Sequence, residues 1–195
     1  MKLSAVALAA LLPVIAASPD IDPGKAIGNP SAPVTVEVFS DYECPACKLF
    51  HDQTLPEMVR DYVTTGKVYV VYRDFPLAMH QYSRQAANYA CAAAHLRLFQ
   101  PVADALFHNQ ASWSASGKVW EYVASALTEH QRKEVQALAQ SPEILAEIQR
   151  DLDVGHREAV NSTPTLIVSR GAKRYPLSGP LNYMLLRQLL DDIAK

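Results

Sequence analysis

Cys44-Pro45-Ala46-Cys47 follows the strand-like run Val34-Thr35-Val36-Glu37-Val38-Phe39-Ser40 and precedes a pattern of apolar residues with helical spacing. The run is rich in β-branched and aromatic residues, which is typical of a buried strand. The cysteines therefore stand where a strand ends and a helix begins. Free N–H groups and the positive end of the helix dipole at that position favour an anion. Because a helix N-terminus in a Cys-X-X-Cys context lowers a thiol pKa, we expect a Cys44 thiolate at neutral pH.

The second cysteine lies one helical turn further on. Residues three apart share a helix face, so Cys44 and Cys47 can form a small disulfide ring with one sulfur exposed and the other covered. A thiolate can then attack Cys44, and Cys47 can resolve the mixed disulfide. Lys48 is a candidate for stabilising the thiolate further, whereas Asp41 and Glu43 would oppose it.

Two other interpretations of the pair stay open. A zinc site normally needs four ligands, and the chain has one further cysteine, Cys91, and no second pair. His51 lies one turn beyond Cys47, so a Cys44/Cys47/His51 metal-binding module is conceivable. A purely structural disulfide across so short a loop would restrain little chain entropy. Cys91 lies in an alanine-rich helical segment, where we expect a buried, inert thiol.

Composition limits the class of function. A chain of 195 residues that is 49% hydrophobic can bury a sizeable core, most simply as one domain with an insertion. Its 18 lysines and arginines nearly balance its 20 aspartates and glutamates, and no basic run occurs. This balance argues against a nucleic-acid partner.

The N-terminus has the pattern of a targeting segment. Lys2 precedes an almost wholly apolar run, which is typical of a signal peptide at 1–17. The run is shorter than the ~20 residues that span a bilayer, and Pro13 interrupts it, so we expect cleavage and a periplasmic or secreted protein. In an oxidising compartment a cysteine pair persists as a disulfide or cycles through one. One pair on a chain large enough to fold without it indicates redox chemistry.

The remaining chain divides into an α/β core and a helical insertion. The segment 18–33 is rich in proline and glycine and is expected to be an exposed lead-in. Two strands joined by a helix, which Pro56 should kink or divide, form a parallel βαβ unit at 34–75. An insertion of four or five helices follows at 76–157, and the second half of the core at 158–195 contains a hairpin, with an edge strand at Pro176, and a last helix. That helix should present one apolar face, formed by Leu185, Leu186, Leu189, Leu190 and Ile193.

Three motifs together resemble the thioredoxin superfamily and, within it, the DsbA family of exported thiol-disulfide oxidoreductases. They are Phe39-Ser40-Asp41-Tyr42-Glu43-Cys44-Pro45-Ala46-Cys47, Val71-Tyr72-Arg73-Asp74-Phe75-Pro76-Leu77 and Ser162-Thr163-Pro164-Thr165. The resemblance extends from about Gly28 to the C-terminus, and its specificity comes from the joint occurrence of the motifs. It implies an α/β, thioredoxin-like fold with an inserted all-helical subdomain. It also implies a cis peptide bond before Pro164, beside the cysteine pair.

The resemblance further implies a role for each matching residue. Cys44 would be the exposed nucleophile and Cys47 the resolving thiol. Thr163 would offer its backbone to an extended, cysteine-containing protein substrate, with Pro164 shaping that surface. The residues supporting this site would be Pro45, Ala46 and Lys48. No cofactor is implied, and we expect a monomer.

Two departures from the family pattern bear on the direction of the reaction. Many members carry a histidine between the cysteines, whereas Pro45-Ala46 offers the thiolate less stabilisation, which predicts a weaker oxidant. The buried acid often found six residues before the first cysteine is Val38 here, and strand alternation points Glu37 to the other face, which leaves a proton relay for Cys47 open.

The leading hypothesis is an oxidase that a membrane partner of the DsbB or vitamin K epoxide reductase type reoxidises. The alternatives are a reductase or isomerase fed by a membrane electron donor, and the metal-binding module.

Overall fold

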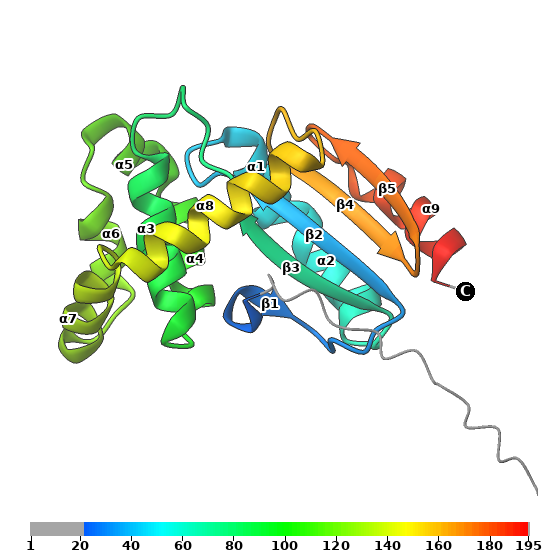
Figure 1. Ribbon diagram of the computed structural model, residues 1–195, viewed down its shortest axis with the longest axis horizontal. Coiled ribbons are helices and arrows are strands. Elements are labelled where there is room, and N and C mark those ends of the chain that lie inside the picture. The colour runs from blue at the N-terminus through cyan, green and yellow to red at the C-terminus, as the bar shows by residue number, and fades with distance from the viewer. Residues whose placement is uncertain (1–21, 195) are drawn as a thin grey trace, which may run out of the picture.

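A five-stranded sheet carries the helix that follows the cysteines (Figure 1). The structure, a computed structural model, describes residues 22–194, so the expected signal peptide at 1–17 lies outside the described residues. The strand order is β1-β3-β2-β4-β5; β2 and β3 are parallel, as predicted, and the other neighbours are antiparallel. In chain order the strands are β1 (Ala26–Ile27), β2 (Val34–Ser40), β3 (Val68–Asp74), β4 (Thr165–Arg170) and β5 (Lys173–Ser178). The strand that contains Pro176 is at the edge, as expected.

The helix after the cysteines changes its hydrogen-bond spacing along its length. It consists of α1 (Pro45–Leu49), the π-helical turn η2 (Phe50–Thr54), α2 (Leu55–Met58) and the π-helical turn η3 (Val59–Val63). Pro56 has no N–H to donate and its ring crowds the preceding turn, so a wider π turn next to it relieves the conflict. Gly66, predicted to end this helix, has φ 73°, and Lys67 N donates to Tyr62 O at 2.9 Å in a Schellman arrangement.

The insertion contains six helices within the described residues, more than the four or five expected. They are α3 (Ser83–His95), α4 (Phe99–His108), α5 (Gln110–Ser116), α6 (Val119–Ser125), α7 (Glu129–Leu138) and α8 (Pro142–Arg157). Two of these helices end without a glycine or proline. Asn109 separates α4 from α5, and Arg97, with φ 60°, lies between α3 and α4. Pro101 does not break a helix, because it lies in the first turn of α4, where its missing N–H is not needed.

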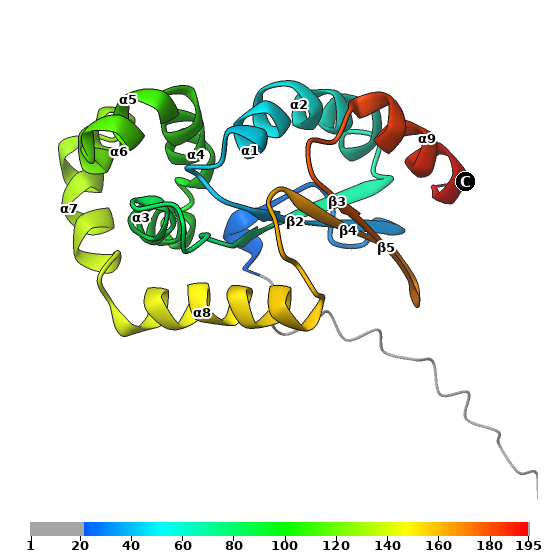
Figure 2. The ribbon, with the colours of Figure 1, turned by 90° about the horizontal axis from the view of Figure 1, so that it is seen from above.

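Helices cover both faces of the sheet. Figure 2 shows α1, α2 and α9 (Tyr183–Ile193) above it and α8 below it, with the remaining helices to one side. Gly155 lets α8 approach closely, because a Cβ there would clash with the ring of Phe75, lying 2.7 Å from its Cδ2. On α9, Leu186 and Leu190 are fully buried, but Leu185 is 67% exposed. The expectation that Leu185 shares the buried face was wrong, since it lies about 100° from Leu186 around the helix.

Part of the segment expected to be an exposed lead-in is buried. The turn η1 (Pro23–Lys25) leads into β1, and Lys25 is only 2% exposed. Its ammonium lies 2.9 Å from Asp74, 2.8 Å from Glu147 and 2.7 Å from Asp151. These carboxylates come from the core sheet and from α8, so Lys25 joins the N-terminal segment to both. None of the helices in residues 22–194 is long and apolar enough to cross a bilayer.

Candidate active site

Cys44 occupies the N-cap position of α1, as the sequence predicted. Its backbone is extended (φ −77°, ψ 121°), and Pro45, whose ring fixes a helical φ, opens the helix. The Cys44 carbonyl accepts from the N–H of Cys47 at 3.1 Å and of Lys48 at 3.2 Å, which starts the helical hydrogen-bond ladder.

The loop that contains the cis peptide bond lies directly against this cysteine. The Thr163–Pro164 bond is cis, as the resemblance implied, and the Cys44 thiol donates to the Thr163 carbonyl oxygen at 3.3 Å. Cys44 is consequently only 7% exposed. The expectation of an exposed nucleophile was wrong in this respect, because the proline loop covers most of the thiol. Thr163 is itself buried.

The two cysteines differ strongly in acidity. The pKa of Cys44 is lowered to about 5, chiefly by the hydrogen bond from the Cys47 thiol, with further help from the Thr163 side chain and from the N–H groups of Cys47 and Ala46. Burial raises the pKa of Cys47 well above its ordinary value, and the hydrogen bond to Cys44 raises it further. At neutral pH the pair therefore holds one thiolate, on Cys44, and one thiol.

This difference predicts the pH dependence of alkylation. Cys44 should react with iodoacetamide at a constant rate above pH 6, and the rate should fall as the pH drops through about 5, because protonation removes the thiolate. Mass spectrometry of the peptide that contains Cys44 measures this rate in the reduced protein. A pH midpoint of the alkylation rate near the pKa of ~8.5 of a free cysteine would contradict the assignment of a thiolate to Cys44 at neutral pH.

Two acidic residues before the cysteines hold a neighbouring loop in place. Asp41 is 1% exposed and accepts hydrogen bonds from Leu77 N at 2.8 Å and from His80 Nδ1 at 2.7 Å. Glu43 accepts from Tyr82 N at 2.7 Å. Asp41 and Glu43 therefore bind the segment after β3 to the cysteine loop, a function that their position in the sequence did not reveal.

A buried glutamine fixes the other side of the cysteine loop. Gln110 Nε2 on α5 donates to the Tyr42 carbonyl at 2.7 Å and to the Cys44 carbonyl at 2.9 Å. Both acceptors lie more than sixty residues earlier in the chain, so no local sequence signal could have identified this contact.

Two residues suggested by the sequence do not take part as expected. Lys48 forms an ion pair with Asp52 at 2.6 Å on the exposed side of the helix, so its charge is already paired. His51 Nε2 lies 2.8 Å from Asp104 Oδ1. Within residues 22–194, Cys44, Cys47 and His51 do not form a group whose ligand atoms all lie close enough to share a metal ion, which argues against the metal-binding alternative with His51 as third ligand.

Three other side chains do come within ligand distance of one another. Possible ligand atoms of Cys91, His95 and Glu147 all lie within 4.8 Å. The carboxylate of Glu147 is, however, already shared between Lys25 at 2.8 Å and His95 at 2.7 Å. Burial raises the pKa of Cys91, whose side chain is fully buried. We therefore assign these residues to the buried ion-pair network.

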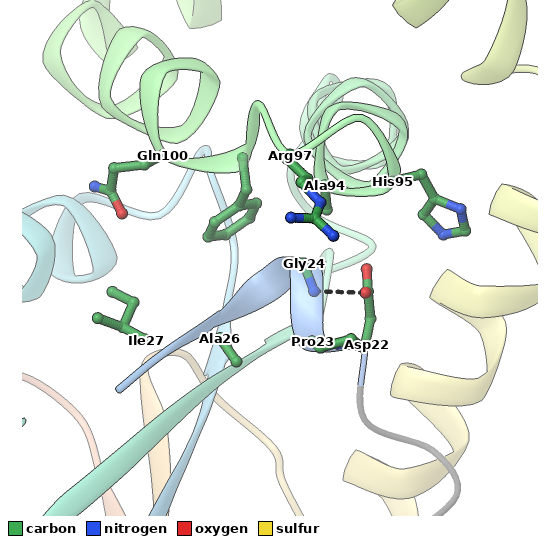
Figure 3. A pocket seen from close by; sticks show the side chains of 10 residues that line it. Asp22, Pro23, Gly24, Ala26, Ile27, Ala94, His95, Arg97 and Gln100 are labelled. Atoms are coloured by element: carbon green, nitrogen blue, oxygen red, sulfur yellow. Dashed lines mark hydrogen bonds between the residues drawn. The ribbon is translucent and has the colours of Figure 1, made fainter. Parts of the chain in front are cut away.

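One cavity lies at the N-terminal turn, and neither Cys44 nor Cys47 lines it. Figure 3 shows this cavity of about 780 Å³, where Asp22, His95, Arg97 and Gln100 surround the N-terminal turn and Gly24 N donates to Asp22 at 2.7 Å. A cavity of about 360 Å³ lies next to the cysteine helix. It is lined by Ala46, Leu49, Phe50, Gln53, Thr54, Pro180, Leu181, Asn182 and Tyr183.

A thiolate at a helix N-cap, a buried partner thiol and a cis-proline loop against them define a thiol-disulfide oxidoreductase with a thioredoxin-like fold. A family model described as Thioredoxin matches residues 21–192, and the chain belongs to that family. Disulfide bond formation protein D of Bacillus subtilis is 22% identical over 169 residues, which cover 80% of this chain and 72% of that protein.

Solved structures agree with this fold. Wolbachia pipientis alpha-DsbA1 matches with a TM-score of 0.73 and 21% identity over 87% of this chain and 90% of its own. Oxidised BdbD of Bacillus subtilis matches with a TM-score of 0.70 and 21% identity, and the match covers 87% of this chain and 92% of BdbD. The predicted resemblance to the DsbA family, with the helical subdomain inserted in a thioredoxin-like core, is confirmed, and the chain is a protein disulfide oxidoreductase of this type.

Proposed function

We propose that this protein is an exported oxidase that introduces disulfides into extended, cysteine-containing proteins, with Cys44 as nucleophile and Cys47 as resolving thiol. In the oxidised enzyme a substrate thiolate attacks Cys44 Sγ, the Cys44–Cys47 bond breaks, and its electron pair stays on Cys47. A second substrate thiolate then attacks the sulfur joined to Cys44, and Cys44 leaves as a thiolate. The observation that carries this proposal is the Cys44 pKa of about 5, since a weakly basic thiolate is a good leaving group.

The substrate would lie along the loop of Thr163 and Pro164. The Thr163 carbonyl accepts from Cys44 while that sulfur carries a proton. In the disulfide form Cys44 has no proton, so the carbonyl is then available for backbone pairing with an extended chain. Apolar side chains near the site supply further contacts: Leu49, beside the smaller cavity, is 51% exposed. Met79, on the segment that Asp41 holds to the cysteine loop, is 82% exposed.

The remaining assignments belong to the same proposal. Residues 1–17 would be a signal peptide, and the mature monomer would act in the periplasm or outside the cell. The two halves of the thioredoxin core would be 34–75 and 158–195, with the helical insertion at 76–157. A membrane partner of the DsbB or vitamin K epoxide reductase type would accept the two electrons gained in each cycle.

The redox potential tests the direction of the reaction. The Cys44 pKa of about 5 lies between the ~3.5 of DsbA and the ~7 of thioredoxin, so we expect a potential between about −120 and −270 mV. Equilibrating the protein in glutathione buffers and quantifying the dithiol form measures this potential. A value at or below that of thioredoxin would reject the oxidase and favour the reductase or isomerase.

A further inference from the structure

Thiol exchange at Cys44 leaves a negative charge on a buried sulfur. When a thiolate attacks Cys44, the electron pair of the broken bond remains on Cys47, which is 1% exposed. Burial raises the pKa of Cys47, so this charge is unfavourable unless hydrogen-bond donors reach the sulfur. A backbone donor does reach it, because the N–H of Asp41 donates to Cys47 Sγ at 3.4 Å.

An acid of β2, Glu37, is engaged elsewhere. Its carboxylate Oε2 lies 2.9 Å from Arg73 Nη2, and Arg73 Nη1 lies 3.0 Å from Asp151 Oδ1 on α8. Figure 2 shows α8 on the opposite face of the sheet from α1, the helix that contains Cys47. Glu37 is therefore paired on the far side of the sheet, which answers the question of a proton relay through this acid.

The backbone of Asp41 is hydrogen-bonded to both cysteines. Its N–H donates to Cys47 Sγ, and its carbonyl accepts from Cys44 N at 3.1 Å. A carbonyl that accepts from the N–H three residues later closes a β-turn, so residues 41–44 form a turn between the end of β2 and the start of α1. The conformation of this turn sets the direction in which the Asp41 N–H points.

The Asp41 side chain fixes the turn through four hydrogen bonds. Oδ1 accepts from Glu43 N within the turn at 2.8 Å and from the Ser83 hydroxyl at the start of α3. Oδ2 accepts from Leu77 N at 2.8 Å and from His80 Nδ1 at 2.7 Å. Because these donors surround a buried carboxylate, they balance its charge and hold it in one position.

We propose that Asp41 is a positioning residue for thiol exchange: its carboxylate holds the turn so that its own N–H stabilises the negative charge left on Cys47. This role rests on the proposed function of the cysteine pair and adds a residue to it. The Cys44–Cys47 bond breaks, the new bond joins Cys44 to the substrate sulfur, and the electron pair stays on Cys47. Asp41 transfers neither a proton nor an electron. It supplies a hydrogen bond from a group that is in place before the charge develops.

The charge of Asp41 would by itself have the opposite effect. A carboxylate near Cys47 disfavours a second negative charge, so loss of the charge alone would lower the Cys47 pKa and speed exchange. Loss of the aligned N–H would raise that pKa and slow exchange. Asparagine has the size of aspartate but cannot accept from all four donors, because its amide nitrogen is itself a donor. The direction of the change in Asp41→Asn therefore separates the two effects.

The test compares Asp41→Asn with the matched control Glu43→Gln. Both variants replace an acid of the cysteine loop by its amide, and both acids hold the segment after β3, Glu43 through Tyr82 N at 2.7 Å. A hydrogen bond to a charged group is worth roughly a factor of ten. Asp41→Asn should therefore slow the reduction of the oxidised protein by dithiothreitol about tenfold, measured by rapid quenching and mass spectrometry of the alkylated thiols. Glu43→Gln should not slow it.

A second measurement leaves Asp41 unchanged, so it does not depend on how an Asp41 variant folds. In Cys44→Ala the hydrogen bond and the charge of Cys44, which raise the pKa of Cys47, are both absent, so Cys47 ionises more readily. NMR should show the Asp41 amide proton moving downfield as Cys47 ionises, with the midpoint that thiolate absorbance gives. Adding Asp41→Asn to Cys44→Ala should raise this midpoint by about one unit, whereas adding Glu43→Gln should not raise it.

The proposal would be overturned by unchanged or faster reduction of Asp41→Asn, or by an equal slowing in Glu43→Gln. An Asp41 amide signal that stays constant across the titration of Cys44→Ala would also overturn it. Loss of exchange in the wild-type protein would instead reject the proposed function.

Discussion

Replacing Cys44 by serine is expected to abolish thiol-disulfide exchange, with a loss of at least about a thousandfold. A serine hydroxyl cannot form the mixed disulfide, and no other thiol can replace Cys44. Cys47 is 1% exposed and its raised pKa keeps it protonated at neutral pH. The rate at which reduced protein cleaves a peptide disulfide in the presence of dithiothreitol measures the loss.

The matched control for this variant is Cys91→Ser. Cys91 is fully buried in α3, and its raised pKa leaves it without thiolate character, so exchange should proceed at the wild-type rate. Because a serine hydroxyl in this position could disturb the packing, Cys91→Ala provides a second variant that adds no hydroxyl group. Loss of exchange in either variant, with the circular dichroism spectrum intact, would show that Cys91 takes part in the chemistry.

The sequence was sufficient to predict those elements whose structure is set by a local pattern of residues. The β-branched run before Cys44, the apolar helical spacing after it and the glycine at the helix end each depend on neighbours in the chain, and the structure has the elements they predict. The cis bond before Pro164 followed from the resemblance of three motifs taken together. The dipeptide alone would have favoured a trans bond.

The features that the sequence did not reveal depend on contacts between distant segments. Gln110 resembles any polar residue of a short helix until α5 places it against the Cys44 carbonyl. Asp41 was expected to oppose the thiolate, and only the folded protein shows that its N–H donates to Cys47 Sγ. The exposure of Cys44 was overestimated because the covering loop comes more than a hundred residues later. The sequence also did not reveal that Lys25 is buried, and its replacement is expected to change the stability of the fold the most.

Lys25→Met should destabilise the protein by about 3–5 kcal/mol, the usual effect of removing one partner from a buried ion pair. Methionine can occupy the space of the lysine stem, so the change in stability reports mainly the loss of the ammonium charge. Without the ammonium, the carboxylates of Asp74, Glu147 and Asp151 lie close together in a buried site and, at a pH at which they are ionised, repel one another. Urea unfolding measures the change. Lys48→Met, which breaks a partly exposed pair with Asp52, serves as control and should change stability by no more than about 1 kcal/mol.

The effect of Lys25→Met should also depend on pH, because the acids left behind can take up protons. Burial raises the pKa of Asp74 to about 6 even with Lys25 present, and the ammonium opposes this rise. Removing Lys25 therefore raises this pKa further. A carboxyl whose pKa is higher in the folded protein than in the unfolded chain binds an extra proton on folding, so its ionisation destabilises the fold as the pH increases. Unfolding experiments at about pH 8 should consequently show the full loss of stability, and those at about pH 5 a smaller one, because Asp74 is then neutral. An equal loss at both pH values would show that Lys25 acts through packing, not through its charge.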